Sequence, residues 1–238
     1  ICPVNSFCPG GNVQTSCANA LLIAPEGSIA ADACICQAGY FGLPNQVCSI
    51  CPRGSWCLGG IRNVCPLNST TTTEGNSDIG ACQCDIGFTY AGLNACRSCE
   101  PGAYKSVIGA ANCTACVGGT YSTSVGAISS GTCQPCPSNT FSAAQSGARQ
   151  DCYCNAGYSG VGGDNCVACI AGTYKINAGP QVCTDCGDNK YSTIVAAISA
   201  DTCQSCSTFA YSSPGSKSPS ACICQGGYFD PANFGVTL

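Results

Sequence analysis

Apolar side chains are sparse along this chain, and the most regular of them are aromatic rings placed at a fixed distance after a cysteine. A ring lies five residues after each cysteine that opens a loop: Phe7, Trp56, Tyr104, Tyr121, Phe141, Tyr174, Tyr191 and Tyr211. Gly or Asn commonly lies three residues after the same cysteine, at Asn5, Gly54, Gly102, Gly119, Asn139, Gly172 and Asn189.

Gly and Asn adopt positive φ more easily than other residues, so each of these positions predicts a tight turn. Such a turn would aim the ring over the adjacent disulfide. Burying one ring contributes about 1.5–3 kcal/mol, which loops with so few other apolar side chains need. The pattern therefore predicts that the rings form the core of small modules; the alternative is an exposed row of rings that binds a partner.

The composition excludes one large domain with a conventional apolar core. Of 238 residues, 27 are Cys, whereas Leu, Ile, Val and Phe together number only 41. Cys at about 11% of the chain is typical of a disulfide scaffold. Several small cross-linked modules fit this composition better.

The charged and titratable residues exclude several classes of function. Because the chain has no His, Cys/His zinc sites, haem ligation through His and the His-based triads of serine hydrolases and cysteine proteases are excluded. The net charge is −4 and the eight Lys and Arg residues are scattered, which argues against nucleic acid and anionic membranes as partners. We expect no enzyme activity, no catalytic residues and no cofactor.

Several features favour an extracellular or cell-surface location. Oxidised cysteines would supply the cross-links that a thin core needs. The sequons at Asn68 and Asn112 agree with secretion, although Ser and Thr are common enough here to produce them by chance. The longest apolar stretch, Ala20 to Ala24, is too short to span a bilayer. The start at Ile1 lacks a Met and a signal-peptide pattern, which favours a processed product or a fragment.

Two tandem repeats organise the chain. From Cys82 onward the cysteines recur at a spacing of 70 residues, and 26 of 70 aligned positions are identical. Before Cys82 a repeat of 48 to 49 residues relates Cys2 to Cys51 and the cysteines that follow each of them. These repeats predict four segments: residues 1–48, 49–96, 97–166 and 167–238.

The first two segments resemble EGF-like modules, over residues 2–96. They have six cysteines in the order of that family, and each Cys-x-Cys is followed by Gly and an aromatic residue, as in Cys36-Gln-Ala-Gly-Tyr40. Six cysteines alone allow 15 connectivities, so the pairing here is what the resemblance implies. It implies Cys2–Cys17, Cys8–Cys34, Cys36–Cys48, Cys51–Cys65, Cys57–Cys82 and Cys84–Cys96.

The later segments resemble the cysteine-rich repeats of ephrin receptors and, more distantly, TNF-receptor modules. They carry Cys116-Val-Gly-Gly-Thr-Tyr-Ser122 and Cys169-Ile-Ala-Gly-Thr-Tyr-Lys175, followed in each case by Cys-x-x-Cys. Consecutive pairing tiles this part of the chain as Cys99–Cys113, Cys116–Cys133, Cys136–Cys152, Cys154–Cys166, Cys169–Cys183, Cys186–Cys203 and Cys206–Cys222. This scheme leaves Cys224 without a partner, because the expected position 236 is Val236. Either the pairing continues in a following repeat, or Cys224 forms a disulfide with another chain.

Other candidate sites are weaker. The run of Ser69, Thr70, Thr71, Thr72 and Thr73 predicts an O-glycosylated loop or reflects chance composition. The Cys-x-x-Cys pairs suggest zinc, but their regular spacing and the sequons favour disulfides, so we expect no metal. Asp185 and Asp188 flank Cys186 and are expected to be a solvated turn rather than an acid/base pair.

The sequence therefore predicts small disulfide-rich modules with short β-hairpins, irregular loops and little or no helix, joined into an elongated tandem-repeat rod. EGF-like and ephrin-receptor-like repeats occur together in protist surface and mastigoneme proteins, and this resemblance implies a glycosylated structural subunit of a cell-surface or flagellar filament. Its expected partners are further copies of itself, other filament subunits and glycans. The alternative is the ligand-binding ectodomain of a receptor or adhesion protein.

Overall fold

The computed structural model describes residues 1–229, and in this part of the chain every strand belongs to a two-stranded antiparallel hairpin. Up to residue 99 the hairpins are β1 (Ser6–Gly10) with β2 (Val13–Ser16), β3 (Leu22–Ile23) with β4 (Ile35–Cys36), β5 (Tyr40–Phe41) with β6 (Ser49–Ile50), β7 (Ser55–Leu58) with β8 (Ile61–Val64), β9 (Ser69–Thr70) with β10 (Gln83–Cys84), and β11 (Phe88–Gly92) with β12 (Ala95–Ser98).

Beyond residue 99 they are β13 (Ala103–Tyr104) with β14 (Thr114–Ala115), β15 (Thr120–Tyr121) with β16 (Gln134–Pro135), β17 (Thr140–Phe141) with β18 (Tyr153–Cys154), β19 (Tyr158–Ser159) with β20 (Val167–Ala168), β21 (Thr173–Tyr174) with β22 (Thr184–Asp185), β23 (Lys190–Tyr191) with β24 (Gln204–Ser205), and β25 (Ala210–Tyr211) with β26 (Ile223–Cys224). The helical residues described are short 3-10 turns: Ala31–Ala33, Ile79–Ala81, Ser130–Thr132, Arg149–Asp151, Ala200–Thr202 and Pro219–Ala221.

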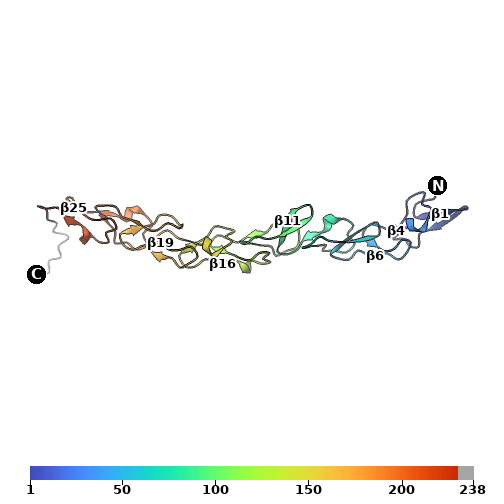
Figure 1. Cartoon of the computed structure of the whole chain (residues 1–238), viewed down its shortest axis with the longest axis horizontal. Coiled ribbons are helices and arrows are strands. Elements are labelled where there is room, and N and C mark those ends of the chain that lie inside the picture. The colour runs from blue at the N-terminus through green and yellow to red at the C-terminus, as the bar shows by residue number, and fades with distance from the viewer. Residues whose placement is uncertain (230–238) are drawn as a thin grey trace. The chain divides into compact units, whose positions relative to one another are not determined.

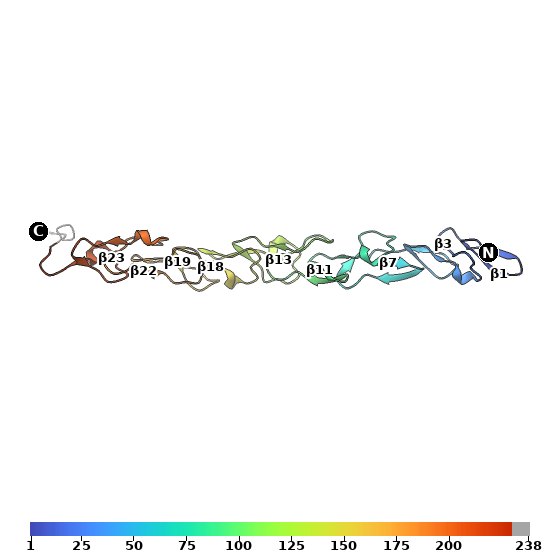
Figure 2. The ribbon, with the colours of Figure 1, turned by 90° about the horizontal axis from the view of Figure 1, so that it is seen from above.

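The chain divides into two compact units. Unit 1 contains Ile1–Cys99, Tyr104–Thr114 and Val125–Ser129, and unit 2 contains Glu100–Ala103, Ala115–Ser124 and the chain from Ser130 onward. Within each unit the hairpins follow one another along the ribbon in chain order (Figure 1), as the second view in Figure 2 also shows. The predicted fold class is confirmed: a disulfide-rich tandem repeat of short hairpins.

The 3-10 turns place cysteines for pairing. Each turn ends immediately before a cysteine, and the N–H of that cysteine donates to the carbonyl of the first residue in the turn, as Cys82 does to Ile79 at 3.0 Å. A hairpin of two-residue strands buries little surface area, and an isolated hairpin is only marginally stable in water. Covalent bridges between neighbouring hairpins therefore take over the stabilising role of a larger sheet.

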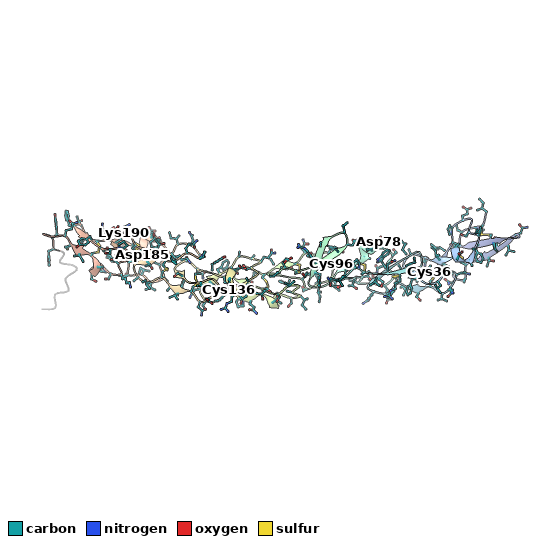
Figure 3. The ribbon with its side chains drawn as sticks, viewed as in Figure 1. Cys36, Asp78, Cys96, Cys136, Asp185 and Lys190 are labelled. Carbon is teal, nitrogen blue, oxygen red and sulfur yellow. A yellow bond between two sulfur atoms is a disulfide. The ribbon has the colours of Figure 1, made fainter. Side chains whose placement is uncertain are left out.

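The structure contains thirteen disulfides among the described residues, each joining consecutive cysteines. Nine are the pairs expected above: Cys36–Cys48, Cys84–Cys96, Cys99–Cys113, Cys116–Cys133, Cys136–Cys152, Cys154–Cys166, Cys169–Cys183, Cys186–Cys203 and Cys206–Cys222. Cys36, Cys96 and Cys136, labelled in Figure 3, belong to three of these bridges.

The four crossed pairs that the EGF resemblance implied are wrong. In place of Cys2–Cys17, Cys8–Cys34, Cys51–Cys65 and Cys57–Cys82, the structure joins Cys2–Cys8, Cys17–Cys34, Cys51–Cys57 and Cys65–Cys82. The hairpin of β7 and β8 gives the reason. The turn before it, where Gly54 has a φ of 75°, brings Cys57 back to Cys51, with Cα atoms 5.7 Å apart, and Cys65 follows the second strand and lies beside Cys82.

The aromatic rings are not the core that the sequence predicted. Phe141 and Tyr211 are about half exposed, and the other six rings are partly buried. Phe7 follows the prediction most closely, because it packs against a buried cluster of Leu22, Ala24 and neighbouring cysteines. Elsewhere the fully buried side chains are mainly the cysteines and the residues on either side of each ring.

Candidate functional site

A backbone contact recurs where one hairpin module meets the next, and we call it the joint. At the joint of Gly157, the glycine N–H donates to the carbonyl of Lys175 at 2.9 Å. The glycine carbonyl accepts from the N–H of Cys169 at 2.8 Å, and the carbonyl of Cys169 accepts from Ala196 at 2.8 Å. Three hydrogen bonds thus fix a turn of one module against the opening loop of the next.

The same joint is present at four further glycines, each within a single unit. Gly39 bonds Cys57 and Cys51, Gly87 bonds Lys105 and Cys99, Gly102 bonds Ser122 and Cys116, and Gly172 bonds Ser192 and Cys186, all at 2.8 to 3.0 Å. The first two bonds also occur at Gly119 and Asn189. The positive φ expected three residues after a loop-opening cysteine is confirmed at all seven positions: Asn5, Gly54, Gly102, Gly119, Asn139, Gly172 and Asn189. Four of these predicted turns, those at Gly102, Gly119, Gly172 and Asn189, are joints.

The joint requires glycine at its tightest positions for two physical reasons. First, φ is positive there, at 83° for Gly172. Second, a Cβ on Gly172 would lie 2.2 Å from the carbonyl oxygen of Gly215, and on Gly157 it would lie 2.4 Å from that of Ala196. No side chain accommodates such an approach to backbone, so these glycines set how closely two modules meet.

Two joints carry a buried lysine in the position that follows the aromatic ring. Lys105 and Lys175 are 2% and 4% exposed, and they are separated by the 70-residue repeat. The Lys175 ammonium donates to the carbonyls of Cys154 at 3.2 Å, Tyr158 at 2.8 Å and Gly179 at 2.7 Å. Lys105 makes the equivalent bonds to Cys84, Phe88 and Gly109 at 3.2, 2.7 and 2.6 Å.

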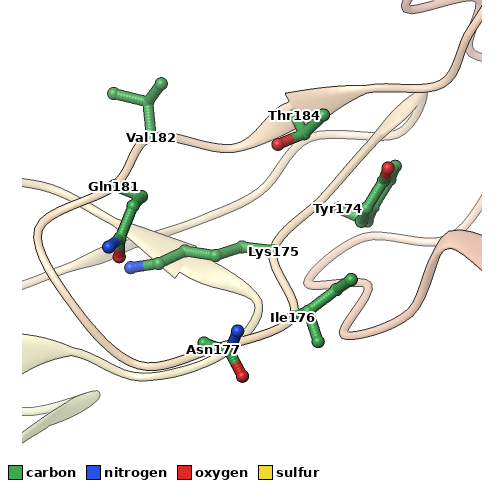
Figure 4. A pocket seen from close by; sticks show the side chains of 7 residues that line it. All are labelled: Tyr174, Lys175, Ile176, Asn177, Gln181, Val182 and Thr184. Carbon is green, nitrogen blue, oxygen red and sulfur yellow. The ribbon is translucent and has the colours of Figure 1, made fainter.

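Each lysine therefore fastens a joint through its side chain. Two of its acceptors lie on the two preceding hairpins, as Cys154 on β18 and Tyr158 on β19 do for Lys175, and the third belongs to its own loop, so one ammonium holds both sides together. The extended Lys175 side chain crosses its loop beside Asn177 and Gln181 in Figure 4, beneath a recess of about 280 Å³. Three N–H groups meet three carbonyls, which satisfies the donor capacity of an ammonium ion.

Burial lowers the pKa of both lysines below the ordinary value, because the ammonium loses its water. At Lys105 the nearby carboxylate of Asp85 partly offsets this effect and raises the pKa. The residue that corresponds to Asp85 in the next repeat is Asn155, and burial alone is the cause of the lowered pKa of Lys175.

We expect Lys175→Met to lower the free energy of unfolding of its module by about 1–3 kcal/mol, since three buried carbonyls lose their donors. Hydrogen exchange of the Gly157 amide, followed by mass spectrometry of the peptides that contain it, measures this loss of stability. Lys190→Met is the matched control, because Lys190 is exposed. Equal protection in both variants would show that the ammonium does not fasten the joint.

The lowered pKa predicts a specific pH dependence. Between that pKa and 10.5, the unfolded lysine holds a proton that the folded lysine has released, so stability rises with pH. The free energy of unfolding of the wild type, measured relative to Lys175→Met, is therefore expected to increase as the pH is raised toward 10.5. Both chains carry Cys224→Ser to prevent thiol exchange. A difference that falls over this interval would contradict the assignment.

The two sequons occupy different environments. Asn112 is exposed, and its side-chain oxygen accepts from the hydroxyl of Thr89 at 3.2 Å. Asn68 is partly buried and has a φ of 61°, because it fills the turn position three residues after Cys65. N-glycosylation stays a prediction at both sites, and the exposed side chain of Asn112 is the better placed of the two.

Only part of the hydroxyl run is an exposed loop, because its first two residues form strand β9. Thr71 is 1% exposed, accepts from the N–H of Gly54 at 2.9 Å and donates to the carbonyl of Ser55. Ser69 and Thr70 are partly buried, and Ser69 donates to the carbonyl of Pro66. O-glycosylation at Thr71 therefore conflicts with the fold, and Thr72 and Thr73 are the exposed members.

Cys224 is the free cysteine of the described chain, and it is partly buried in β26. Position 236, where its partner was sought, lies outside the described residues. Asp185 and Asp188 are exposed, as a solvated turn requires. Within residues 1–229 no group of three or more Cys, Asp or Glu side chains is arranged to hold a metal ion, and no helix is long and apolar enough to cross a bilayer.

The sequence reasoning missed the two lysines. A signal was available, because Tyr104-Lys105 and Tyr174-Lys175 align in the 70-residue repeat of a chain with only eight Lys and Arg in total. The scattered Lys and Arg residues were considered only as an argument against nucleic acid and membranes, and lysine is seldom buried. Their burial follows from the short loops, which bring backbone carbonyls to the ammonium.

Comparison with known proteins agrees with this geometry. The family described as tyrosine-protein kinase ephrin type A/B receptor-like matches residues 87–133 and 157–203, which are the two stretches that contain the lysine joints. The chain therefore carries ephrin-receptor-like cysteine-rich repeats, as the later segments predicted. The EGF-like pairing of the first two segments has no such support.

Two proteins of Toxoplasma gondii are similar to this chain. It is 30% identical to cysteine repeat modular protein B over 148 residues, which is 58% of the chain and 2% of that protein. It is 25% identical to cysteine repeat modular protein A in an alignment 256 positions long, gaps included, that covers 98% of the chain and 8% of that protein. The chain thus spans less than a tenth of the length of either relative.

Proposed function

We propose that this chain is an extracellular structural segment, a disulfide-stapled spacer of a cell-surface or flagellar filament. The recurring joint is the observation that supports it. Three backbone hydrogen bonds and a glycine in close contact recur at five joints, two of these bonds recur at Gly119 and Asn189, and a bridge closes each loop. Such coupling resists bending, extension and proteolysis, as in other arrays where each repeat contacts its neighbours.

The small number of charged residues and the lack of a recognisable catalytic motif in the sequence also favour a structural role over catalysis. The density of disulfides favours an oxidising compartment, because reducing conditions would open the bridges. Glycans at Asn112 would add a solvated coat to such a spacer. The similarity to repeat proteins of far greater length is consistent with a segment that supplies distance between other parts.

Small-angle X-ray scattering of the oxidised monomer tests this proposal. A compact domain of this length has a radius of gyration of about 18 Å. The proposal predicts a clearly larger value together with a narrow, well-defined cross-section. Reduction of the bridges is expected to abolish the cross-section. A compact particle, or a scattering curve of a flexible coil before reduction, would contradict the proposal.

A ligand-binding ectodomain is the second candidate, and one observation favours it. Unit 1 has an apolar recess of about 640 Å³ lined by Ile35, Phe41, Leu43, Pro44 and Ile61, among others. If this recess is a binding site, the probe anilinonaphthalene sulfonate should bind at one saturable site that Leu43→Asp removes. Unsaturable binding that Leu43→Asp leaves unchanged would argue against this role.

A further inference from the structure

The disulfides give tension a short covalent path along the chain. Since each bridge joins two cysteines with no other cysteine between them, a pull on the chain crosses the bridge and bypasses the residues of its loop. Only the residues between one bridge and the next remain in this path. A bypassed loop releases no length, even where the joint that holds it has opened.

Most of the connections between bridges are already extended. Ten of the twelve connections from Cys2 to Cys222 are one or two residues long. These ten lie in strands β4, β6, β10, β12, β14, β16, β18, β20, β22 and β24. A residue in a strand already spans nearly the full length that the backbone permits, so these connections hold no folded chain to release.

The connection from Cys57 to Cys65 differs, because residues 58–64 fold back on themselves. They form the turn and second strand of the β7–β8 hairpin, in which Cys57 lies opposite Arg62, three residues before Cys65. The two cysteines are therefore separated by little more than the length of half a strand. Extension of the same residues at about 3.5 Å each would lengthen the path by about 15–20 Å.

The β1–β2 hairpin has the same arrangement one repeat earlier in the chain. Residues 9–16, between the first and second bridges, form its turn and second strand. One polar pair crosses each hairpin: the Gln14 amide donates to the hydroxyl of Ser6 at 3.3 Å, and the Arg62 guanidinium donates to that of Ser55 at 2.9 Å. The two long connections are thus the same structural element, repeated.

The second strand of each hairpin is held mainly by the first strand. All four residues of β2 are exposed, as are three of the four residues of β8. The tip of the β7–β8 hairpin adds one bond, from the N–H of Gly42 to the carbonyl of Gly60 at 3.1 Å. An isolated hairpin is only marginally stable in water, so a small tension is enough to open these two.

We propose that the β1–β2 and β7–β8 hairpins are extensible links in a spacer that otherwise releases no length between Cys2 and Cys222. Each link opens in one step under tension and closes again when the tension falls, because the bridges on either side of it stay intact. Both links belong to unit 1, whereas the connections within unit 2 are of the short kind. This device rests on the proposed structural role and adds a defined extensibility to it.

Optical tweezers measure the extension of the oxidised chain, with one handle on the N-terminus and the other on the free thiol of Cys224. The wild type is expected to lengthen in two reversible steps of about 15–20 Å each. A Gly-Ser insertion of four residues between Gly59 and Gly60 is expected to lengthen one step by about 14 Å. The matched control is the same insertion between Gly92 and Leu93, at the tip of the β11–β12 hairpin. The Cys84–Cys96 bridge bypasses that tip, so the control should leave both steps unchanged.

A pair of glycine substitutions tests whether the hairpin itself opens. Gly59 has a φ of 60° and nothing within 4 Å of an added Cβ, so Gly59→Ala strains the turn alone. It is expected to shift one step toward the open state by at least about fivefold at a given tension. Gly92→Ala is the matched control, because Gly92 also has positive φ and nothing within 4 Å of an added Cβ, but lies in the bypassed hairpin.

Three results would overturn the device: a wild type that lengthens without the two steps, insertions that lengthen the chain equally, or alanine variants that behave alike. The scattering of the relaxed monomer tests the structural role separately. An elongated particle without steps contradicts the device alone, whereas a compact particle with steps contradicts the structural role alone.

Discussion

Replacing Cys186 and Cys203 together by serine is expected to lower the free energy of unfolding of their module by about 3 kcal/mol, because their bridge closes a loop of 17 residues. The module has few buried apolar side chains to compensate for the loss. Denaturation followed by hydrogen exchange of peptides from residues 169–206 measures the change. Exchange should rise first in that module and in the neighbours joined to it at Gly172 and Asn189.

Cys224→Ser provides the control, since Cys224 has no disulfide in the described chain. It is expected to change the stability by less than about 0.5 kcal/mol. A small effect of the double replacement, comparable to that of the control, would show that buried side chains rather than bridges stabilise the modules.

The second large effect is expected from Gly172→Ala. The added Cβ would lie 2.2 Å from the carbonyl of Gly215, and the φ of 83° costs an alanine about 1–2 kcal/mol. Loss of the joint bonds to Ser192 and Cys186 adds about 0.5–1.5 kcal/mol for each bond. We therefore expect a total destabilisation of about 2–5 kcal/mol, confined to this joint.

Hydrogen exchange of the amides of Gly172 and Cys186 reports directly on that joint, because both donate within it. Gly187→Ala is the matched control: Gly187 lies in the Cys186–Cys203 loop that Gly172 contacts, has ordinary φ and has nothing within 4 Å of an added Cβ. If the two variants exchange alike, the close approach at Gly172 does not determine how the modules meet.

Much of the fold followed from cysteine spacing. From Cys99 onward every bridge spans 12 to 17 residues, so consecutive pairing was the simple solution and the structure contains it. In the first two segments, by contrast, the pairing was inferred from the EGF-like order of cysteines. That order does not reveal that Cys57 lies on β7, folded back over Cys51 at a Cα separation of 5.7 Å.

The core was harder to predict from the sequence than the bridges were. A ring at a regular position suggested burial, yet the short strands leave Phe141 and Tyr211 half exposed. The residue after most of the rings is buried instead. Ser122 and Ser142 are each 1% exposed, and the equivalent Lys105 and Lys175 are 2% and 4% exposed. Polar side chains fill these positions because backbone carbonyls of the joint are there to accept their hydrogen bonds, as the Thr120 carbonyl does from Ser142 at 2.8 Å.

The joint turns at Gly102, Gly119, Gly172 and Asn189 were predicted at the correct residues but for an incomplete reason, whereas those at Gly39, Gly87 and Gly157 were not predicted. Positive φ explains Asn189 as well as Gly172. The additional requirement, the absence of a Cβ, depends on a carbonyl that lies 43 residues further along the chain at Gly215, and no local pattern shows it.

The disulfide map of the native, unreduced chain tests the central claim most directly. Proteolytic peptides analysed by mass spectrometry are predicted to be linked between consecutive cysteines throughout, including Cys2 to Cys8 and Cys51 to Cys57. Links from Cys2 to Cys17 or from Cys51 to Cys65, or free thiols across the repeats, would contradict it.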